Sequence, residues 1–504
     1  MPKELPGFYY DSEKNRYFPL KGPIPGSSRK RKSPPLFSAA KGKSIYKCMK
    51  IKSSKLLQAR ELCGQLITTR KGKFSFQMEY QKRQASQPMI WKYNTKGMVD
   101  NALEQMSARL DRLEGTVETD ILLTGNVNGQ LCIFEVGKVG EEFNHGPKLL
   151  PDRVWPSNAG DSAGCIELPG LEWRYPGAIQ NMPSTISCIK MCQKHHQSVE
   201  TASSNRALIT TLGSERSGGT VYILNLSEQL DLNSHLPIFW RLSEITSFDH
   251  TVWTADCNLD GNRAVIGTNT GAALVNIDTG MTSWICRCKS DVFSVQLDQS
   301  GNTMLCGLRN GAILSIDARQ RPENFSSRLP RHQIPYRTHE TSSGRAKKFH
   351  QERFEMSMQL KGNMCRSDAI FMPSSISCIA SLTLYDQYFL ASSMDGSINL
   401  YDNRLTQRGA VQSYEGNVNS HTRIQLGVDP SESIVMSGGE DCYLRLWSIK
   451  SGEMLFRNKF MNAIPSVVCW PRTGGIHGVH SVQNRTRGAW LGSQDGLFHI
   501  GWPV

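Results

Sequence analysis

The sequence lacks the patterns of secreted and membrane-spanning proteins. None of its 14 cysteines forms a Cys-x-x-Cys pair, and most lie inside apolar segments, which is typical of buried thiols in a reducing compartment. No apolar run approaches the ~20 residues that cross a bilayer. The first seven residues lack the charged-then-apolar order of a signal peptide. We therefore expect a soluble, intracellular protein.

Signatures of enzyme chemistry are also missing. The sequence has no Walker A loop, no dinucleotide fingerprint after a strand, no HExxH pair and no GxSxG nucleophile elbow. One close cluster of metal-type residues contains Cys188, Cys192, His195 and His196. Zinc sites need ordered Cys and His spacings, and adjacent histidines are poor ligands for one ion. We expect no enzyme activity, no cofactor and no metal.

What the sequence does contain is an internal repeat. Residues 182–189 read MPSTISCI, and residues 372–379 read MPSSISCI. A unit of strand, tight glycine- or asparagine-containing turn and second strand recurs seven times along the chain, because such turns need the positive φ that Gly and Asn supply at low cost. The turns are 40 residues apart from Gly271 to Gly311 and 46 apart from Gly396 to Cys442, close to the spacing of WD-repeat blades.

These units predict an all-β fold, a seven-bladed WD-repeat β-propeller over residues 98–504. A β-sandwich or an open solenoid is the alternative, but a ring leaves no long sheet edge exposed. The last unit lacks an outer strand, and we expect residues 88–93 to supply it as a latch. Two longer spacings predict insertions at about 137–182 and 320–363. Residues 101–113 allow a helical or an irregular conformation.

The formal charge of +13 is concentrated in the N-terminal part. Residues 1–100 hold 22 Lys and Arg against 6 Asp and Glu, whereas the remaining 404 hold 36 against 39. Residues 320–366 are also basic, with 10 Lys and Arg against 4 Glu, which suggests an acidic partner surface for this insertion. The charge therefore belongs to a tail and a loop rather than to a basic domain.

Residues 1–50 form the basic N-terminal tail, which we expect to be mostly disordered. Within it, the FYY and RYF segments could pair as an aromatic hairpin. The tail also contains the run Arg29, Lys30, Arg31 and Lys32. This run is a candidate nuclear-import signal, a candidate nucleic-acid contact, or a solvated tail. We expect a nuclear protein, with the cytoplasm as a second location.

Two further features of the sequence are a predicted helix before the repeats and a repeated Asp-x-Arg pattern. Residues 53–70 predict a helix with one apolar stripe, although Gly64 weakens that prediction. This predicted helix and the latch strand both belong to a segment over residues 51–97. An Asp-x-Arg pattern ends the third strand of two units, at Asp317 with Arg319 and at Asp402 with Arg404. Residues two apart in a strand project on the same side. They present a charged pair at one rim of the ring, or a solvated pair that contributes little.

The segments LASSMDGSINLYDNR and GGEDCYLRLWS, together with the opening LPGFYYDSEKNRYF, resemble WD-repeat substrate receptors of cullin-4 RING ubiquitin ligases. The resemblance is to the DDB1- and CUL4-associated factor 4 family, also called the WD-repeat protein 21 type. It covers both ends and the repeat frame. It implies a non-catalytic receptor whose partners are a DDB1-type adaptor and an unknown protein substrate, which is recruited for ubiquitination.

The resemblance also implies which residues contact the adaptor. The family uses a WDxR-type box and a helical segment before the propeller. The box falls on Asp395, Tyr401, Asp402 and Arg404 in one unit, and on Asp317 and Arg319 in the preceding unit. The helical segment contributes Leu56, Leu57, Arg60 and Leu66. Tyr401 and Ile316 stand where the box has Trp, so the box after Ile316 is the weaker one.

We expect the opposite rim, with the two insertions, to bind the target, since binding residues concentrate on loops over a rigid scaffold. The alternative hypothesis is a nuclear WD-repeat scaffold, or a nucleic-acid-associated protein, with no ubiquitin-ligase role. Nucleic acid is the less favoured partner, because the basic run lacks the interleaved aromatic residues that bind single strands. No membrane partner is expected.

Overall fold

The computed structural model divides the chain into two units, Met1–Ile51 and Lys52–Val504. In the part of the chain that it describes, neither helix is long and apolar enough to cross a membrane. The described residues are 8–11, 16–19, 53–64, 66–69, 72–95, 97–112, 115–138, 148–149, 151–156, 169–173, 179–194, 204–214, 217–226, 230–231, 241–288, 290–298, 300–319, 369–471 and 488–502.

The first unit contains a two-stranded hairpin. Strand β1 (Phe8–Asp11) pairs antiparallel with β2 (Arg16–Pro19), and Tyr9 lies opposite Phe18. The predicted hairpin is therefore confirmed. The basic run at residues 29–32 and the insertion at 320–363 lie outside the described residues.

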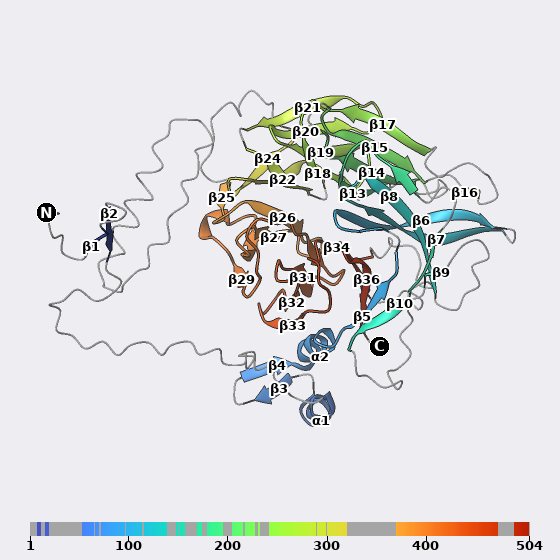
Figure 1. Cartoon of the computed structure of the whole chain (residues 1–504). Helices are drawn as coiled ribbons and strands as arrows, with labels where there is room; N and C mark the ends of the chain where they lie inside the picture. Colours follow the sequence, from blue (N-terminus) through green and yellow to red (C-terminus); the bar gives the residue numbers. More distant parts are fainter. Residues whose placement is uncertain are drawn as a thin grey trace. The chain divides into compact units, whose positions relative to one another are not determined.

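The second unit is a ring of seven antiparallel sheets, which confirms the predicted propeller (Figure 1). We call the sheets blades 1 to 7 and name the four strands of each blade A to D from the axis outwards. Every A strand contacts the A strands of its two neighbours, and the A strand of blade 7 contacts that of blade 1. The sheets therefore close on themselves.

The strands of the blades, in the order A to D, have the following bounds. Blade 1 contains β6 (Ala102–Arg112), β7 (Gly115–Gly125), β8 (Gln130–Lys138) and β11 (Pro169–Trp173). Blade 2 contains β13 (Ile186–Lys194), β14 (Ser204–Thr211), β15 (Thr220–Asn225) and β17 (Leu242–Ser247). Blade 3 contains β18 (Val252–Cys257), β19 (Arg263–Thr268), β20 (Gly271–Asn276) and β21 (Thr282–Arg287). Blade 4 contains β22 (Val292–Leu297), β23 (Thr303–Leu308), β24 (Ala312–Asp317) and β25 (Ala369–Phe371).

The last three blades follow the same order. Blade 5 contains β26 (Ile376–Ser381), β27 (Tyr388–Ser393), β28 (Ile398–Asp402) and β29 (Gln412–Tyr414), with the short 3-10 helix η3 (Thr406–Arg408) before β29. Blade 6 contains β30 (Leu426–Val428), β31 (Ile434–Gly438), β32 (Leu444–Ser448) and β33 (Met454–Asn458). Blade 7 contains β34 (Val467–Cys469), β35 (Gly488–Ser493), β36 (Gly496–Gly501) and β5 (Met89–Tyr93).

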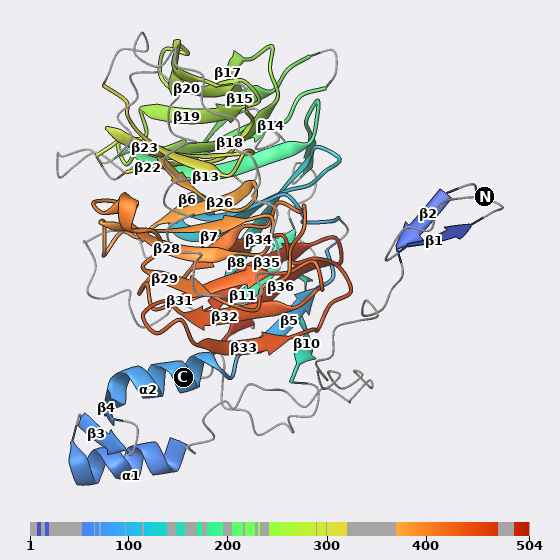
Figure 2. The same cartoon turned by 90° about the vertical axis from the view of Figure 1, so that its left-hand side faces the viewer.

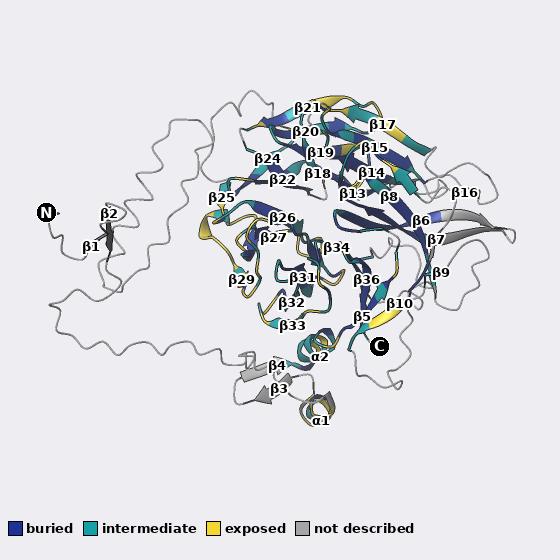
Figure 3. Ribbon diagram, viewed as in Figure 1, coloured by how far each residue is buried: buried dark blue, intermediate teal, exposed yellow. Residues whose placement is uncertain are grey.

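The turns between strands B and C explain the repeat that is visible in the sequence. Gly271 begins β20 directly after the turn from β19, with φ 144, and a Cβ atom there would lie 2.1 Å from the backbone oxygen of Cys286. Only glycine fits both the backbone conformation and the space. Buried residues follow the strands (Figure 3). Clusters such as that of Val265, Val292 and Leu314 join neighbouring blades, which is the core that the repeated apolar runs predict.

The ring is closed by a strand from before the first blade. β5 pairs with β36 along its whole length, from Leu497 opposite Tyr93 to Gly501 opposite Met89. Ile90 in this strand is fully buried, in a cluster that also contains residues of blades 6 and 7. This is the latch that the sequence predicts at residues 88–93.

Two predictions about secondary structure are wrong, and one helix is additional. The helix predicted at 53–70 is α1 (Ser53–Cys63), and it ends at Gly64, whose φ is +68; Leu66 lies instead in the hairpin of β3 (Leu66–Thr69) and β4 (Gly72–Ser75). A second helix, α2 (Phe76–Ala85), precedes the latch. Residues 102–112 form the A strand of blade 1 rather than a helix or an irregular segment, because pairing along the full length of β7 overrides the local pattern.

The insertion at 137–182 also has structure of its own. It contains β9 (Lys148–Leu149), β10 (Pro151–Trp155) and β12 (Ile179–Asn181), besides the D strand of blade 1. β10 pairs with β5 and adds a fifth strand to blade 7. Elsewhere, β16 (Leu230–Asp231) pairs with the A strand of blade 1.

Strand direction defines two rims. Since neighbouring strands are antiparallel, the A–B and C–D connections lie at one rim, which we call rim 1. The B–C connections and the links to the next blade lie at the other, rim 2. Both insertions connect a C strand to a D strand, so they leave the propeller from rim 1. The expectation that they lie opposite the two Asp-x-Arg motifs is therefore wrong.

The buried latch residue gives a test of ring closure. Replacing Ile90 by Ala should lower the free energy of unfolding by about 2–4 kcal/mol, because it leaves a cavity between blades. Urea unfolding followed by tryptophan fluorescence measures the change. Leu62→Ala, at a side chain that is 78% exposed, is the control and should change stability by less than about 0.5 kcal/mol. Equal effects of the two substitutions would contradict a latch that closes the ring.

Candidate functional site

Two Asp–Arg pairs lie at rim 1 of adjacent blades, at the ends of the C strands of blades 4 and 5. Arg404 donates from Nε to Asp402 Oδ1 at 3.1 Å and from Nη2 to Oδ2 at 2.9 Å. Arg319 makes the same two bonds to Asp317, at 2.9 and 2.8 Å. In both motifs the arginine backbone N–H also donates to the aspartate, at 2.9 Å. The repeated geometry confirms that each Asp and Arg form a pair.

The pairs fix an arginine at the surface rather than stabilise the fold. The hydrogen bonds from Arg319 lower the pKa of Asp317 to about 2, and those from Arg404 lower the pKa of Asp402. The arginine side chains are 67% and 65% exposed, and exposed pairs contribute little to stability. Each guanidinium is therefore held in one orientation with most of its surface open to solvent.

The other two residues of the expected box lie elsewhere. Tyr401 is buried at 4% exposure, stacks on Phe389 with ring centroids 5.5 Å apart, and accepts a hydrogen bond from Asn399. Asp395 lies in the turn between β27 and β28, at rim 2, where it accepts hydrogen bonds from Ser397. The structure thus brings the two Asp–Arg pairs to one rim and places Tyr401 in the core and Asp395 at the opposite rim.

Four exposed apolar side chains lie at the same rim of blade 5 as the Asp402–Arg404 pair, and sequence reasoning missed them. Leu384 and Tyr385 come from the A–B connection of blade 5 and are 64% and 53% exposed. Leu405 and Val411 come from its C–D connection and are 43% and 56% exposed. We call these four residues the blade-5 apolar patch. The available signal was the occurrence of leucines and a tyrosine in polar turns, where solvent exposure does not favour them.

The helical segment presents a different surface from the one expected. Leu56 is buried at 5% exposure, and the Arg60 guanidinium lies 5.0 Å from the centre of the Phe76 ring of α2. Leu57 and Leu62 are exposed, at 43% and 78%. Leu56 and Arg60 therefore hold α1 against α2, and Leu57 and Leu62 are free to contact a partner. The side chain of Leu66 lies outside the described residues.

Helix α2 attaches the helical segment to rim 1. Lys82 forms an ion pair with Glu453, 3.1 Å away in the C–D connection of blade 6, and α2 packs against strand β33 (Figure 2). Trp502 donates to the backbone oxygen of Ala85 at 3.1 Å. Gln412 of blade 5 abuts the same connection, since a Cβ atom on Gly452 would lie 2.1 Å from its side-chain nitrogen. The helices and the blade-5 apolar patch therefore border neighbouring parts of one rim.

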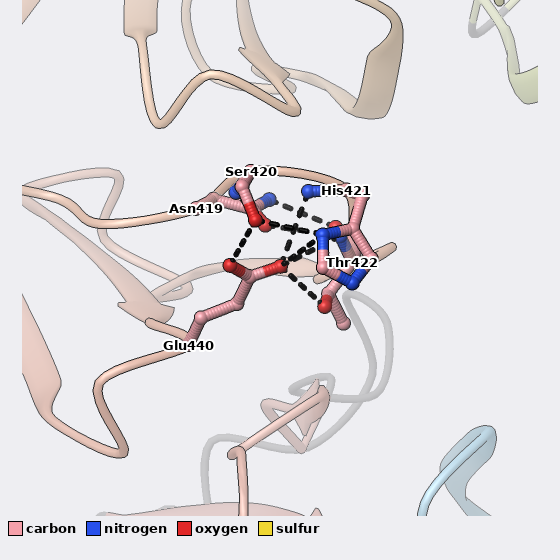
Figure 4. A network of polar contacts seen from close by, with 5 residues as sticks. All are labelled: Asn419, Ser420, His421, Thr422 and Glu440. Carbon is pink, nitrogen blue, oxygen red and sulfur yellow. Dashed lines mark hydrogen bonds and ion pairs between the residues drawn. The ribbon is translucent and has the colours of Figure 1, made fainter. Parts of the chain in front are cut away.

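A polar network orders rim 2 at the junction of blades 5 and 6. Glu440 accepts hydrogen bonds from the hydroxyls of Ser420 and Thr422, both at 2.6 Å, and from the backbone N–H groups of His421 and Thr422, at 3.1 and 3.0 Å (Figure 4). Burial raises the pKa of Glu440, but these hydrogen bonds outweigh it and lower the pKa to about 2. Glu440 therefore fixes the link that leads into blade 6.

The structure describes only half of the cysteine–histidine cluster. Cys188 and Cys192 are buried in β13, and His195 and His196 lie outside the described residues. Within the described parts of the chain, no group of three or more His, Cys, Asp or Glu side chains is placed to hold a metal ion.

The ring and its rims define the class as a seven-bladed WD-repeat β-propeller. Residues 350–487 match the family model described as "DDB1- and CUL4-associated factor 4 beta-propeller domain". The chain is 32% identical over 129 residues to bovine DDB1- and CUL4-associated factor 4, covering 25% of this chain and 26% of that protein. It is 31% identical over 163 residues to human DDB1- and CUL4-associated factor 4-like protein 2, covering 28% of this chain and 41% of that protein.

These matches span between about a quarter and two fifths of the length of the curated relatives. The family match extends from before blade 5 to just before strand B of blade 7. It therefore includes the Asp402–Arg404 pair, the blade-5 apolar patch and the Glu440 network. The resemblance to the DDB1- and CUL4-associated factor 4 family, which the sequence motifs indicate, is confirmed over this part of the chain.

The Glu440 network predicts a pH-dependent stability. The pKa of Glu440 in the folded protein, about 2, is below its ordinary value of 4.5. The contribution of Glu440 to the free energy of unfolding is therefore fully present above pH 4.5 and is lost as the pH falls towards 2. Glu440→Gln should cost roughly 1 kcal/mol or more at pH 7, and the difference from wild type should shrink over that acid range. Thermal unfolding at several pH values measures it.

The matched control for this prediction is Glu415→Gln, at an exposed glutamate in the same link between blades. It should leave the unfolding temperature close to that of the wild type at every pH. A Glu440→Gln effect that stays constant from pH 7 to the acid limit would rule out the charged network as its cause.

Proposed function

We propose that this protein is a non-catalytic substrate receptor of a cullin-4 RING ubiquitin ligase, and that it binds a DDB1-type adaptor through rim 1. The observation that carries the proposal is the location of three features on one rim: the helical segment, the Asp–Arg pairs and the blade-5 apolar patch. The names of the similar proteins associate them with DDB1 and CUL4, which supports the same partner for this chain.

The chemistry of rim 1 suits a protein partner. Burying an exposed leucine-sized side chain contributes about 1.5–3 kcal/mol, and a centrally placed arginine is a frequent hot spot of interfaces. Asp402 orients Arg404 before binding, so less side-chain freedom is lost when a partner arrives. The blade-5 apolar patch supplies the apolar area that a partner buries, and Arg404 supplies hydrogen bonds of defined direction.

A receptor of this kind acts through proximity. It needs no reactive group, because holding a target beside the ubiquitin-carrying enzyme raises the effective concentration of the target lysines. If rim 1 binds the adaptor, rim 2 stays open for the target. We further propose that Arg29, Lys30, Arg31 and Lys32 direct nuclear import, since such a basic run suits recognition by an import receptor.

The blade-5 surface gives the first test of this function. The double substitution Arg404→Ala and Leu405→Asp should weaken adaptor binding by at least about tenfold, because it removes the oriented cation and puts a charge into the apolar patch. Co-purification with purified DDB1-type adaptor, followed by biolayer interferometry, measures the loss. Arg309→Ala is the matched control: this arginine is 68% exposed and paired with Asp291, but it lies in a B–C turn at rim 2.

The control variant should bind the adaptor like the wild type. If the wild-type protein fails to bind the adaptor at all and instead retains nucleic acid in a salt-sensitive manner, the receptor proposal fails. The alternative of a nuclear scaffold or nucleic-acid-associated protein then stands.

The helical segment gives a separate test. Leu57→Asp together with Leu62→Asp should weaken adaptor binding by roughly tenfold and leave the unfolding temperature nearly unchanged, because both side chains are exposed. The Leu56→Asp variant should instead destabilise the segment, since that side chain is buried. Unaltered adaptor affinity in the Leu57/Leu62 variant would remove α1 from the interface.

A further inference from the structure

A cavity of about 190 Å³ lies at the rim 2 end of the propeller axis. Its walls come from the A strands, or from the residues just before them, of blades 1, 2, 3, 6 and 7, and from Leu212 after the B strand of blade 2. Apolar surface comes from Leu212, Trp253 and Val467, and polar groups come from Asn101, Ser187 and Arg423. This mixture of apolar walls and a few polar groups is what ligand sites use.

Two donors beside this cavity have no acceptor. Arg423 reaches from blade 6 across to blade 3, where its Nη1 donates to the backbone oxygen of Trp253 at 2.6 Å. The Nε of Arg423 and the indole Nε1 of Trp253 are both buried, and neither has a hydrogen-bond partner among the described residues. A buried donor without an acceptor costs about 1–3 kcal/mol. Neither of these two atoms has accessible surface, so a ligand in the cavity meets the guanidinium charge of Arg423 rather than these donors.

The charge of Arg423 is also unpaired. It forms no ion pair with any carboxylate in the described parts of the chain, and the groups that act on it electrostatically are the thiols of Cys188 and Cys378. Burial lowers the pKa of Arg423, but a guanidinium stays protonated in proteins. The axis of the propeller therefore holds a cation that lacks a counter-charge.

The one carboxylate in the cavity wall is already engaged. Asp100 is 8% exposed and accepts a hydrogen bond from the backbone N–H of Val127 at 3.1 Å. Burial raises the pKa of this carboxyl, and Arg423 is not among the groups that shift it. Asp100 therefore does not neutralise Arg423, and it would oppose a second negative charge placed against its own side of the cavity.

The position of Arg423 is set by the polar network at rim 2. Glu440 holds residues Ser420 to Thr422, and Arg423 follows directly in the chain. Its guanidinium is tied at the far end to Trp253, and the Trp253 ring is held edge-on against Phe293 with centroids 5.0 Å apart. The side chains of Arg423 and Trp253 therefore occupy fixed positions before any ligand enters, which reduces the entropy cost of binding.

We propose that this axial cavity binds a glutamate side chain of a peptide segment that enters from rim 2. The carboxylate pairs with the charged guanidinium of Arg423, and its methylene groups contact Leu212 and Val467. The cavity is small enough that a single side chain fills it. If the protein is the receptor proposed above, this segment belongs to the target, and only that last identification depends on the proposed function.

The test uses the full-length isolated chain and needs no adaptor. The probe is the blocked peptide acetyl-Gly-Gly-Glu-Gly-Gly-amide, and the matched peptide has Gln in place of Glu. The indole N–H resonance of Trp253, assigned by its loss in Trp253→Phe, is followed during the titration. We expect a saturable shift with the Glu peptide, with a dissociation constant on the order of 1 mM or tighter, and at least about tenfold weaker binding of the Gln peptide.

Variants separate the cavity from general charge attraction. Arg423→Gln should abolish the saturable shift, and Arg423→Lys should weaken it, because lysine keeps the charge but loses the planar fork. Arg309→Gln removes an exposed charge from the same rim and should leave the shift unchanged. Circular dichroism shows whether each variant is folded, and the comparison of the Glu and Gln peptides needs no variant at all.

Three results with the peptides would overturn the proposal: no saturable shift, equal shifts with the two peptides, or full binding by folded Arg423→Gln. Inorganic phosphate is titrated in parallel. Phosphate that binds as tightly as the Glu peptide would show a site for a free anion and would overturn the peptide assignment. Each of these failures leaves the adaptor measurement at rim 1 unaffected, so the two proposals fail separately.

Discussion

The pairing of β5 with β36 is the interaction on which the rest of the structure depends. A propeller blade is stable only when its neighbours cover both faces, and the last blade has three strands of its own until β5 completes it. The closed ring fixes the relative positions of residues that are far apart in sequence. The two rims exist because all seven blades meet in one closed ring. Five of these blades line the cavity on the axis.

The antiparallel order of the strands separates two sets of features. The Asp–Arg pairs, the blade-5 apolar patch and the contacts of α2 all lie at rim 1, where the A and C strands end. The Glu440 network and Arg423 occur where A strands begin. A single sheet therefore presents one surface at each end of its strands, and a partner bound to rim 1 does not compete with a ligand that enters from rim 2.

Much of the fold follows from local signals, and most of the site does not. Turn glycines such as Gly271 and the repeated MPS(T/S)ISCI segment indicate the blades, because a tight turn constrains the residue that can occupy it. The helix predicted at 53–70 extends beyond the observed end of α1 at Cys63, although Gly64 indicates where the helix ends. The exposure of Leu384 and Leu405, and the meeting of Arg423 with Trp253 across the axis, depend on ring geometry, and no local pattern encodes them.

The order of the latch strands along the chain has a consequence for biosynthesis. β5 is made about four hundred residues before β36, so the ring cannot close while the ribosome is still translating blades 1 to 6. Contacts between such distant segments form slowly, and an unpaired strand edge invites association with other chains. β10 follows β5 closely in sequence and pairs with its other edge, so the nascent chain can shield one side of this strand long before its permanent neighbour emerges.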